Sequence, residues 1–144
     1  MSDAPCIFCA IAAGQAPARK VAEDDRTLAF LDIFPLTRGH ALVIPKRHAR
    51  DLLEVSTDDL AAVAAMAQRV ARVSLAPAPG GLAAEGVNLL QANGAIAFQT
   101  VFHFHVHVLP RYRGDGFRLE VQRQPGDEAV MDGVADVYRR GVNG

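Results

Sequence analysis

The chain has 144 residues, half of them hydrophobic, which is enough for one domain with an apolar core of its own. Its 15 basic and 16 acidic side chains leave a formal net charge of −1, which excludes the strongly basic surface typical of proteins that bind nucleic acid or anionic membranes. Residues 1–5 lack the basic, apolar character of a leader peptide, and no apolar run approaches the length of a membrane span. We therefore expect a cytoplasmic protein whose two cysteines are reduced.

Cys6 and Cys9 form a C-x-x-C pair close to the N-terminus. In redox enzymes such a pair usually stands at the start of a helix that follows a strand. No strand is expected before Cys6 in this chain. A structural zinc site is an alternative, but two thiolates need two more ligands to complete a tetrahedron. The spacing alone leaves zinc binding, redox activity and simple packing open.

The first half of the chain predicts strands followed by a long helix. Residues 20–23 and 27–33 form two strands around a turn at residues 24–25, and residues 40–44 form a third. Residues 56–75 form the clearest helix, with acidic side chains in its first turn. Apolar side chains on more than one face of this helix indicate a second packing partner and predict a homodimer built on it.

The second half predicts a strand at residues 87–91, a short strand at 118–122, and a closing helix that begins at Gly126 or Asp127. Together these elements predict a single α+β domain spanning residues 1–144. It would contain an antiparallel sheet of about five strands, one long helix and one C-terminal helix.

Residues 99–111 read QTVFHFHVHVLPR, in which His103, His105 and His107 alternate with apolar residues. The alternation predicts a strand that carries all three imidazoles on one face and buries the other. Successive residues on one face lie about 6.6 Å apart, so a single ion with bonds of about 2 Å could take two of these histidines but hardly three. A lone histidine is usually structural, whereas three on one face indicate a nucleophile, a proton carrier or a ligand.

These features form a set of motifs that resembles the histidine triad (HIT) family of nucleotide hydrolases and transferases. The signature H-φ-H-φ-H-φ-φ, with φ apolar, stands at residues 103–109. The likeness continues through CIFC (6–9), AFLDIFP (29–35), GHALVIPKRH (39–48) and NGAIAFQTVFHFHVHVLPR (93–111). It implies an α+β, HIT-like fold, and members of the family usually pair as dimers with the long helix at the partner.

The resemblance also implies nucleophilic catalysis by a histidine. His105 would attack the α-phosphorus of a purine nucleotide and expel its substituent, and water would then release the nucleoside monophosphate from the covalent intermediate. His107 would donate a hydrogen bond to the phosphate, and His40 would orient the triad. The remaining contacts implied by the resemblance are Asp32 at the ribose, Phe8, Phe30 and Ile33 at the base, and Thr100 and Gln99, with the neighbouring Asn93, at the phosphate.

In zinc-bearing relatives, the C-x-x-C pair joins two histidines in a structural zinc site. One lies two residues before the nucleophile and the other in an I-P-K-x-H segment. The resemblance therefore implies one structural zinc per chain, held by Cys6, Cys9, His48 and His103.

Two positions depart from the family pattern. Many relatives have Asn where this chain has Ala92, and Gly where it has Phe98. The first change removes a polar contact, and the second places a bulky side chain where glycine is usually favoured.

Two other functions compete with a nucleotidyl hydrolase or transferase. One is a nucleotide-binding interaction protein with little turnover, and the other is a metallohydrolase that uses the triad as a metal site.

Overall fold

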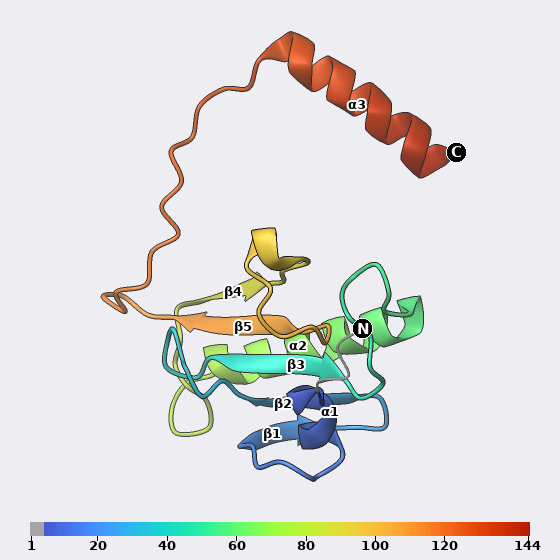
Figure 1. The fold of residues 1–144 in the computed structure, drawn as a ribbon. Helices are drawn as coiled ribbons and strands as arrows, with labels where there is room; N and C mark the ends of the chain where they lie inside the picture. Colours follow the sequence, from blue (N-terminus) through green and yellow to red (C-terminus); the bar gives the residue numbers. More distant parts are fainter. Residues whose placement is uncertain (1–4) are drawn as a thin grey trace.

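The computed structural model describes residues 5–144, and residues 1–4, on which the expectation about a leader peptide partly rests, lie outside that range. Its centre is one antiparallel sheet with strand order β1-β2-β3-β5-β4 (Figure 1). The strands are β1 (Lys20–Glu23), β2 (Thr27–Leu31), β3 (Ala41–Pro45), β4 (Gly86–Leu90) and β5 (Val106–Arg111). The predicted α+β class and the five-stranded antiparallel sheet are confirmed.

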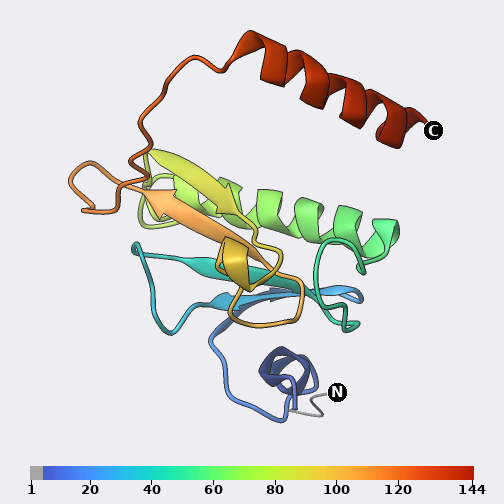
Figure 2. The same ribbon diagram turned by 45° about the horizontal axis from the view of Figure 1, so that its top comes forward.

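Helices α1 (Ile7–Ala12) and α2 (Thr57–Leu75) lie on opposite faces of the sheet (Figure 2). Alternating strand residues divide between them because successive side chains point to opposite faces. Ala29, Val43 and Val108 pack with α2, whereas Leu28, Phe30, Leu42 and Ile44 pack with Phe8 and Ile11 of α1. Burial on both faces accounts for the nearly continuous apolar run of β3.

The long helix begins where the sequence predicts. Ser56 is its N-cap, and the Ser56 hydroxyl accepts a hydrogen bond from the Asp59 amide at 3.1 Å. Val63, Met66 and Ala67 of α2 are buried against the sheet. The short helix α1 was not expected from the sequence, since its six residues are too few to show a helical period.

The predicted histidine strand is wrong in its extent, because β5 starts only at Val106. Upstream of it the backbone groups have other partners: the His103 carbonyl accepts from the His105 ring at 2.7 Å, and the Phe104 amide donates to the Ala49 carbonyl. The neighbouring strand β4 pairs with residues 107–111 of β5 and does not extend the pairing upstream of His107. The alternation of faces nevertheless continues, since Phe104 and Val108 pack with α2.

Residues 118–122, which the sequence suggests as a short strand, have no regular structure. They belong to an extended segment that leads away from the sheet to α3 (Glu128–Asn143), whose N-cap is the predicted Asp127 (Figure 1). No helix within residues 5–144 is long and apolar enough to cross a membrane.

Candidate active site and metal centre

A cavity of about 510 Å³ opens on the α1 face of the sheet and contains two residues of the triad, His105 and His107. Its apolar walls come from α1, from the end of β2 and from the segment before β5. The lining includes seven residues that the sequence assigned to substrate or catalysis: Phe8, Phe30, Asp32, Ile33, Thr100, His105 and His107.

His105 is held by its own backbone. Its Nδ1–H donates to the His103 carbonyl at 2.7 Å, and the ring is only 6% exposed. A neutral imidazole that donates through Nδ1 carries a free lone pair on Nε2. The ring therefore presents an unprotonated nitrogen, which is the form required of a nucleophile.

A second hydrogen-bond chain sets the tautomer of His107. The Leu36 amide donates to His40 Nδ1 at 3.1 Å, so the proton of His40 is on Nε2. His40 Nε2 donates to His107 Nδ1 at 2.8 Å, which leaves the His107 proton on Nε2 as a donor. Asp32 Oδ2 lies 3.5 Å from His40 Nε2 and completes the chain.

Burial keeps these imidazoles neutral. It lowers the pKa of His105, and it lowers the pKa of His107 to about 4 with help from the neighbouring His105 and His40. The pKa of His40 is also lowered by burial, with Asp32 acting in the opposite direction. At neutral pH the site therefore contains uncharged donors and acceptors in fixed tautomers.

Gln99 and Asn93 hold the loop beside the cavity and do not line the cavity itself. The buried Gln99 amide accepts from the Gly94 amide at 2.8 Å and donates to the Arg50 and Val101 carbonyls. The Asn93 side chain accepts from the Leu52 amide at 2.8 Å and exchanges hydrogen bonds with Gln91.

Phe98, which stands where many relatives have glycine, has a φ of 70° and a ring that is 88% exposed. The left-handed backbone explains the preference for glycine, because a Cβ is strained there. The ring has no buried contact to compensate for that strain.

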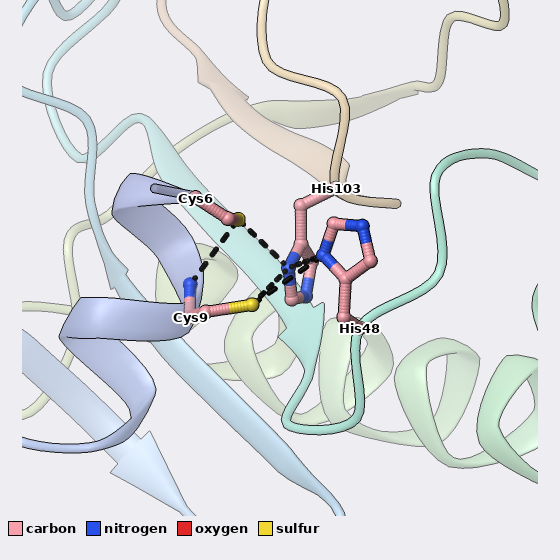
Figure 3. A group of neighbouring side chains, drawn as sticks. All are labelled: Cys6, Cys9, His48 and His103. Atoms are coloured by element: carbon pink, nitrogen blue, oxygen red, sulfur yellow. Dashed lines mark hydrogen bonds between the residues drawn. The ribbon is translucent and has the colours of Figure 1, made fainter. Parts of the chain in front are cut away.

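A second cluster lies beside the cavity and joins three segments of the chain (Figure 3). Cys6 and Cys9 come from the start of α1, His48 from the loop after β3, and His103 from the segment before β5. Their sulfur and nitrogen ligand atoms all lie within 4.8 Å of one another.

The distances within this cluster match a tetrahedral zinc site. Ligand atoms with Zn–S bonds of about 2.3 Å and Zn–N bonds of about 2.0–2.1 Å lie roughly 3.3–3.8 Å apart around the ion. The sulfur-to-nitrogen distances here are 3.3 Å (Cys6 to His103), 3.4 Å (Cys9 to His48) and 3.5 Å (Cys9 to His103), and the two Nδ1 atoms are 3.2 Å apart. The four predicted ligands therefore fit the group.

His103 is oriented for a metal by its outer nitrogen. Its Nε2–H donates to the Pro45 carbonyl at 2.8 Å, so Nδ1 presents its lone pair to Cys6, Cys9 and His48. The ring is fully buried. His103 thus points into the cysteine cluster while His105 and His107 line the cavity, which agrees with the expectation that the three histidines do not share one ion.

The ring of Phe8 lies between the two centres. Its centroid is 5.2 Å from that of His105 and 6.0 Å from that of His103, in edge-to-face arrangements. Because Phe8 lies between Cys6 and Cys9, a metal that fixes α1 also fixes this wall of the cavity.

The model of the HIT domain family matches residues 13–114. The chain belongs to the HIT family. An uncharacterised HIT-like protein of Mycobacterium tuberculosis is 46% identical over 130 residues, which are 88% of each chain. The adenosine 5'-monophosphoramidase of Schizosaccharomyces pombe is 42% identical over 106 residues, or 74% of each chain. The resemblance inferred from the motifs is thereby confirmed.

Solved HIT structures have the same fold. A Streptococcus mutans protein has a TM-score of 0.89 and 38% identity, with 98% of this chain and 87% of that chain covered. For a HIT family protein of Bacillus anthracis the TM-score is 0.85, the identity 38%, and the coverage 99% and 98%. A Zn-bound histidine triad family protein of Mycobacterium smegmatis has a TM-score of 0.73 and 43% identity, with coverage of 92% and 96%. This HIT chain therefore has zinc-bearing relatives.

Sequence reasoning missed part of the cavity wall. Ile7 and Ile11 of α1, Phe34 and Val101 also line it. Ile7 and Phe34 stand within the CIFC and AFLDIFP motifs, next to residues that the sequence singled out, and that adjacency was the available signal.

Proposed function

We propose that this HIT protein is a nucleotidyl hydrolase or transferase that acts at the α-phosphorus of purine nucleotides through a covalent intermediate on His105. The single observation that carries the proposal is the hydrogen bond from His105 Nδ1 to the His103 carbonyl, which leaves Nε2 unprotonated. The resemblance to a yeast adenosine 5'-monophosphoramidase supports nucleoside phosphoramidates as one substrate class. Dinucleoside polyphosphates and related conjugates belong to the same chemistry.

In the first step, His105 Nε2 forms a bond to the α-phosphorus while the bond to the leaving group breaks, and a departing amine takes up a proton from solvent. Water then attacks the phosphorus, the bond from phosphorus to His105 Nε2 breaks, and the nucleoside monophosphate is released as the water gives up a proton to solvent. Two easier displacements replace one difficult one. The Nε2–H of His107, fixed by His40, would donate to a phosphate oxygen as negative charge develops.

The cavity wall suggests how the nucleotide is held. Asp32 would accept hydrogen bonds from the ribose hydroxyls, and the base would lie among Phe8, Phe30 and Ile33. Thr100 and the backbone of residues 98–100 would bind the phosphate. Gln99 and Asn93 would act by holding this loop in place, since their amides are bonded to Arg50 and Leu52.

We further propose one structural zinc per chain, held by Cys6, Cys9, His48 and His103. A metal bound there would cross-link α1 to the segment that carries His105, and no step of the reaction uses it.

We also propose that the protein is cytoplasmic and forms homodimers through α2. The exposed apolar side chains of Ala61, Ala65 and Val73 on this helix support the dimer. The composition favours no nucleic-acid or membrane partner.

The decisive experiment combines a steady-state assay with a chemical trap. Adenosine and guanosine phosphoramidates and dinucleoside polyphosphates are assayed with and without a chelator, while circular dichroism confirms that the chain remains folded. A second sample is quenched in mid-turnover, and the peptide that carries His105 is examined by mass spectrometry.

We expect turnover to survive chelation and an acid-labile nucleotide adduct to form on His105. Turnover that stops with the chelator while the fold persists would identify a metallohydrolase. Tight nucleotide binding without turnover would identify an interaction protein. Near-normal turnover in His105→Ala would show that another residue is the nucleophile.

A further inference from the structure

A second cavity, of about 530 Å³, lies on the other face of the sheet, between α2 and the strands β1, β2 and β3. Its volume falls within the range of about 300–1,000 Å³ that is typical of sites for small organic ligands. The walls are almost entirely apolar and include Ala22, Leu31, Ala41, Val70 and Leu82. Neither His105 nor His107 lines it, so the proposed reaction leaves this cavity without a role.

Small residues on the strand side leave this space unfilled. Ala22 of β1 and Ala41 of β3 face α2, and Gly39 stands just before β3. Gly39 has a φ of 89°, and a Cβ added there would collide with the side chain of Leu82. Leu82 therefore packs directly on the Gly39 backbone and forms the wall at this end of the cavity.

One charged group reaches the cavity, the guanidinium of Arg69. Arg69 is exposed on α2 and forms neither an ion pair nor a side-chain hydrogen bond within residues 5–144. Burial opposes the ionisation of Asp24, whereas hydrogen bonds from Arg26 and Thr27 and the charge of Arg69 lower its pKa. Asp24 Oδ1 accepts from the Arg26 amide and from the amide and hydroxyl of Thr27. The hydrogen-bond donors of Arg69 thus stay free for another acceptor.

Ser74 is the other polar side chain of the wall, and its proton is already used. The buried Ser74 hydroxyl donates to the Val70 carbonyl at 3.0 Å, so it has no donor for a ligand. Arg69 and Ser74 are five residues apart, which is about 7.5 Å along the helix axis. The charge therefore lies toward one end of the cavity, and the apolar wall continues beyond it.

We propose that this cavity binds a medium-chain fatty acid, whose carboxylate pairs with Arg69 while its tail lies among Ala22, Leu31 and Leu82. A guanidinium binds a carboxylate through two parallel hydrogen bonds. One cation matches the single charge of a carboxylate, whereas a phosphate group carries more than one negative charge and would also face the nearby Asp24. The inference does not depend on the proposed hydrolase activity.

Calorimetric titration of the full chain with octanoate tests both the charge and the tail. Arg69→Gln should bind octanoate at least tenfold more weakly, because it loses a charged hydrogen-bonding partner. Arg72→Gln removes the same charge from α2 away from the cavity and should bind like the wild type. Hexanoate, which is shorter by two methylenes, should bind the wild type roughly fifteenfold more weakly than octanoate. Circular dichroism verifies that both variants are folded.

Nuclear magnetic resonance locates the ligand. Octanoate should shift the backbone amides of Ala22, Val70 and Leu82 and leave those of Thr100 and Val101, beside His105, in place. Three results would each overturn the proposal: no saturable binding at millimolar octanoate, shifts confined to the cavity of His105, or equal affinities in the two arginine variants.

A second copy of the chain is the competing occupant, because Val73 of the proposed dimer face also lines the cavity. Titrations at protein concentrations that differ tenfold distinguish the two. An octanoate affinity that does not change with protein concentration supports the proposal. An affinity that falls as the protein concentration rises would show that the second copy occupies this face, and the fatty-acid site would be rejected.

Discussion

His40 Nε2 lies 2.8 Å from His107 Nδ1, although 67 residues separate the two side chains in sequence. The Leu36 amide bound to His40 Nδ1 determines which of these two nitrogens carries the proton. A backbone amide just before β3 thus sets the tautomer of an imidazole on β5. The same amide therefore controls which nitrogen of His107 is a donor in the cavity.

His40 should act as a positioning residue. In His40→Leu the buried Nδ1 of His107 loses its donor, at a cost of about 1–3 kcal/mol, so we expect kcat to fall by roughly ten- to a hundredfold with little change in KM. His40→Gln keeps an N–H donor on a side chain of similar reach and should recover part of the rate. Steady-state kinetics of both variants check this prediction, and equal rates in the two would contradict it.

The titration of His107 should make the protein sensitive to acid. The pKa of His107 is about 4 in the folded chain, below the value of about 6.5 for an unfolded histidine. The unfolded chain therefore binds the proton first as the pH falls. The stability contributed by neutral His107 is complete above about pH 6.5 and is lost as the pH falls toward about 4. Urea unfolding at several pH values and an NMR titration of the His107 ring measure both quantities, and an NMR midpoint near 6.5 would contradict the account.

Loss of the metal should affect stability before chemistry. Cys9→Ser removes one of four ligands, and because metal binding is coupled to folding we expect loss of zinc and a lower Tm. At temperatures where the variant remains folded, kcat should change much less than Tm. Elemental analysis and thermal unfolding provide the two readouts. Protein purified without a chelator that contains no zinc would refute the metal assignment.

Asp32 should discriminate ribonucleotides from substrates without ribose hydroxyls. A hydrogen bond to a charged group is worth about 1.5–3 kcal/mol, so Asp32→Ala should weaken ribonucleotide binding by roughly ten- to a hundredfold. Asp32→Asn serves as the matched variant, because its oxygen can still accept the 2.8 Å bond from the Phe34 amide. Isothermal titration with ribose and 2′,3′-dideoxyribose nucleotides measures the difference. An equal loss for both ligands would mean that Asp32 supports the fold of the loop and does not contact the sugar.

Phe98→Gly should stabilise the protein. A side chain at a φ of 70° costs about 1–2 kcal/mol, and the greater freedom of glycine in the unfolded chain offsets about 0.5–1 kcal/mol of the relief. We therefore expect a gain of up to about 1.5 kcal/mol in the free energy of unfolding. Phe98→Ala removes the exposed ring but keeps the strained backbone and should gain nothing. Denaturant unfolding of the two variants separates the strain from the side chain.

Local patterns in the sequence determined much of this protein. The alternation within residues 103–109 assigned the histidines and the apolar residues to opposite faces, and Ser56 and Asp127 marked the starts of the two longer helices. These features are readable because strand alternation and helix capping depend on neighbours in sequence. The ligand set of Cys6, Cys9, His48 and His103 came from the resemblance to the HIT family, since the spacing of the C-x-x-C pair alone left zinc binding, redox activity and packing open.

Only the tertiary structure decided where β5 begins, which tautomers the histidines adopt and that no side chain of α3 is buried among residues 5–144. His103 and His105 lie outside β5 because the His105 ring occupies the His103 carbonyl and Ala49 binds the Phe104 amide. The tautomer of His107 depends on Leu36, and the cavity depends on Phe8 lying against His105. These contacts join residues far apart in the chain, and their hydrogen bonds and burial exist only once the sheet has brought those residues together.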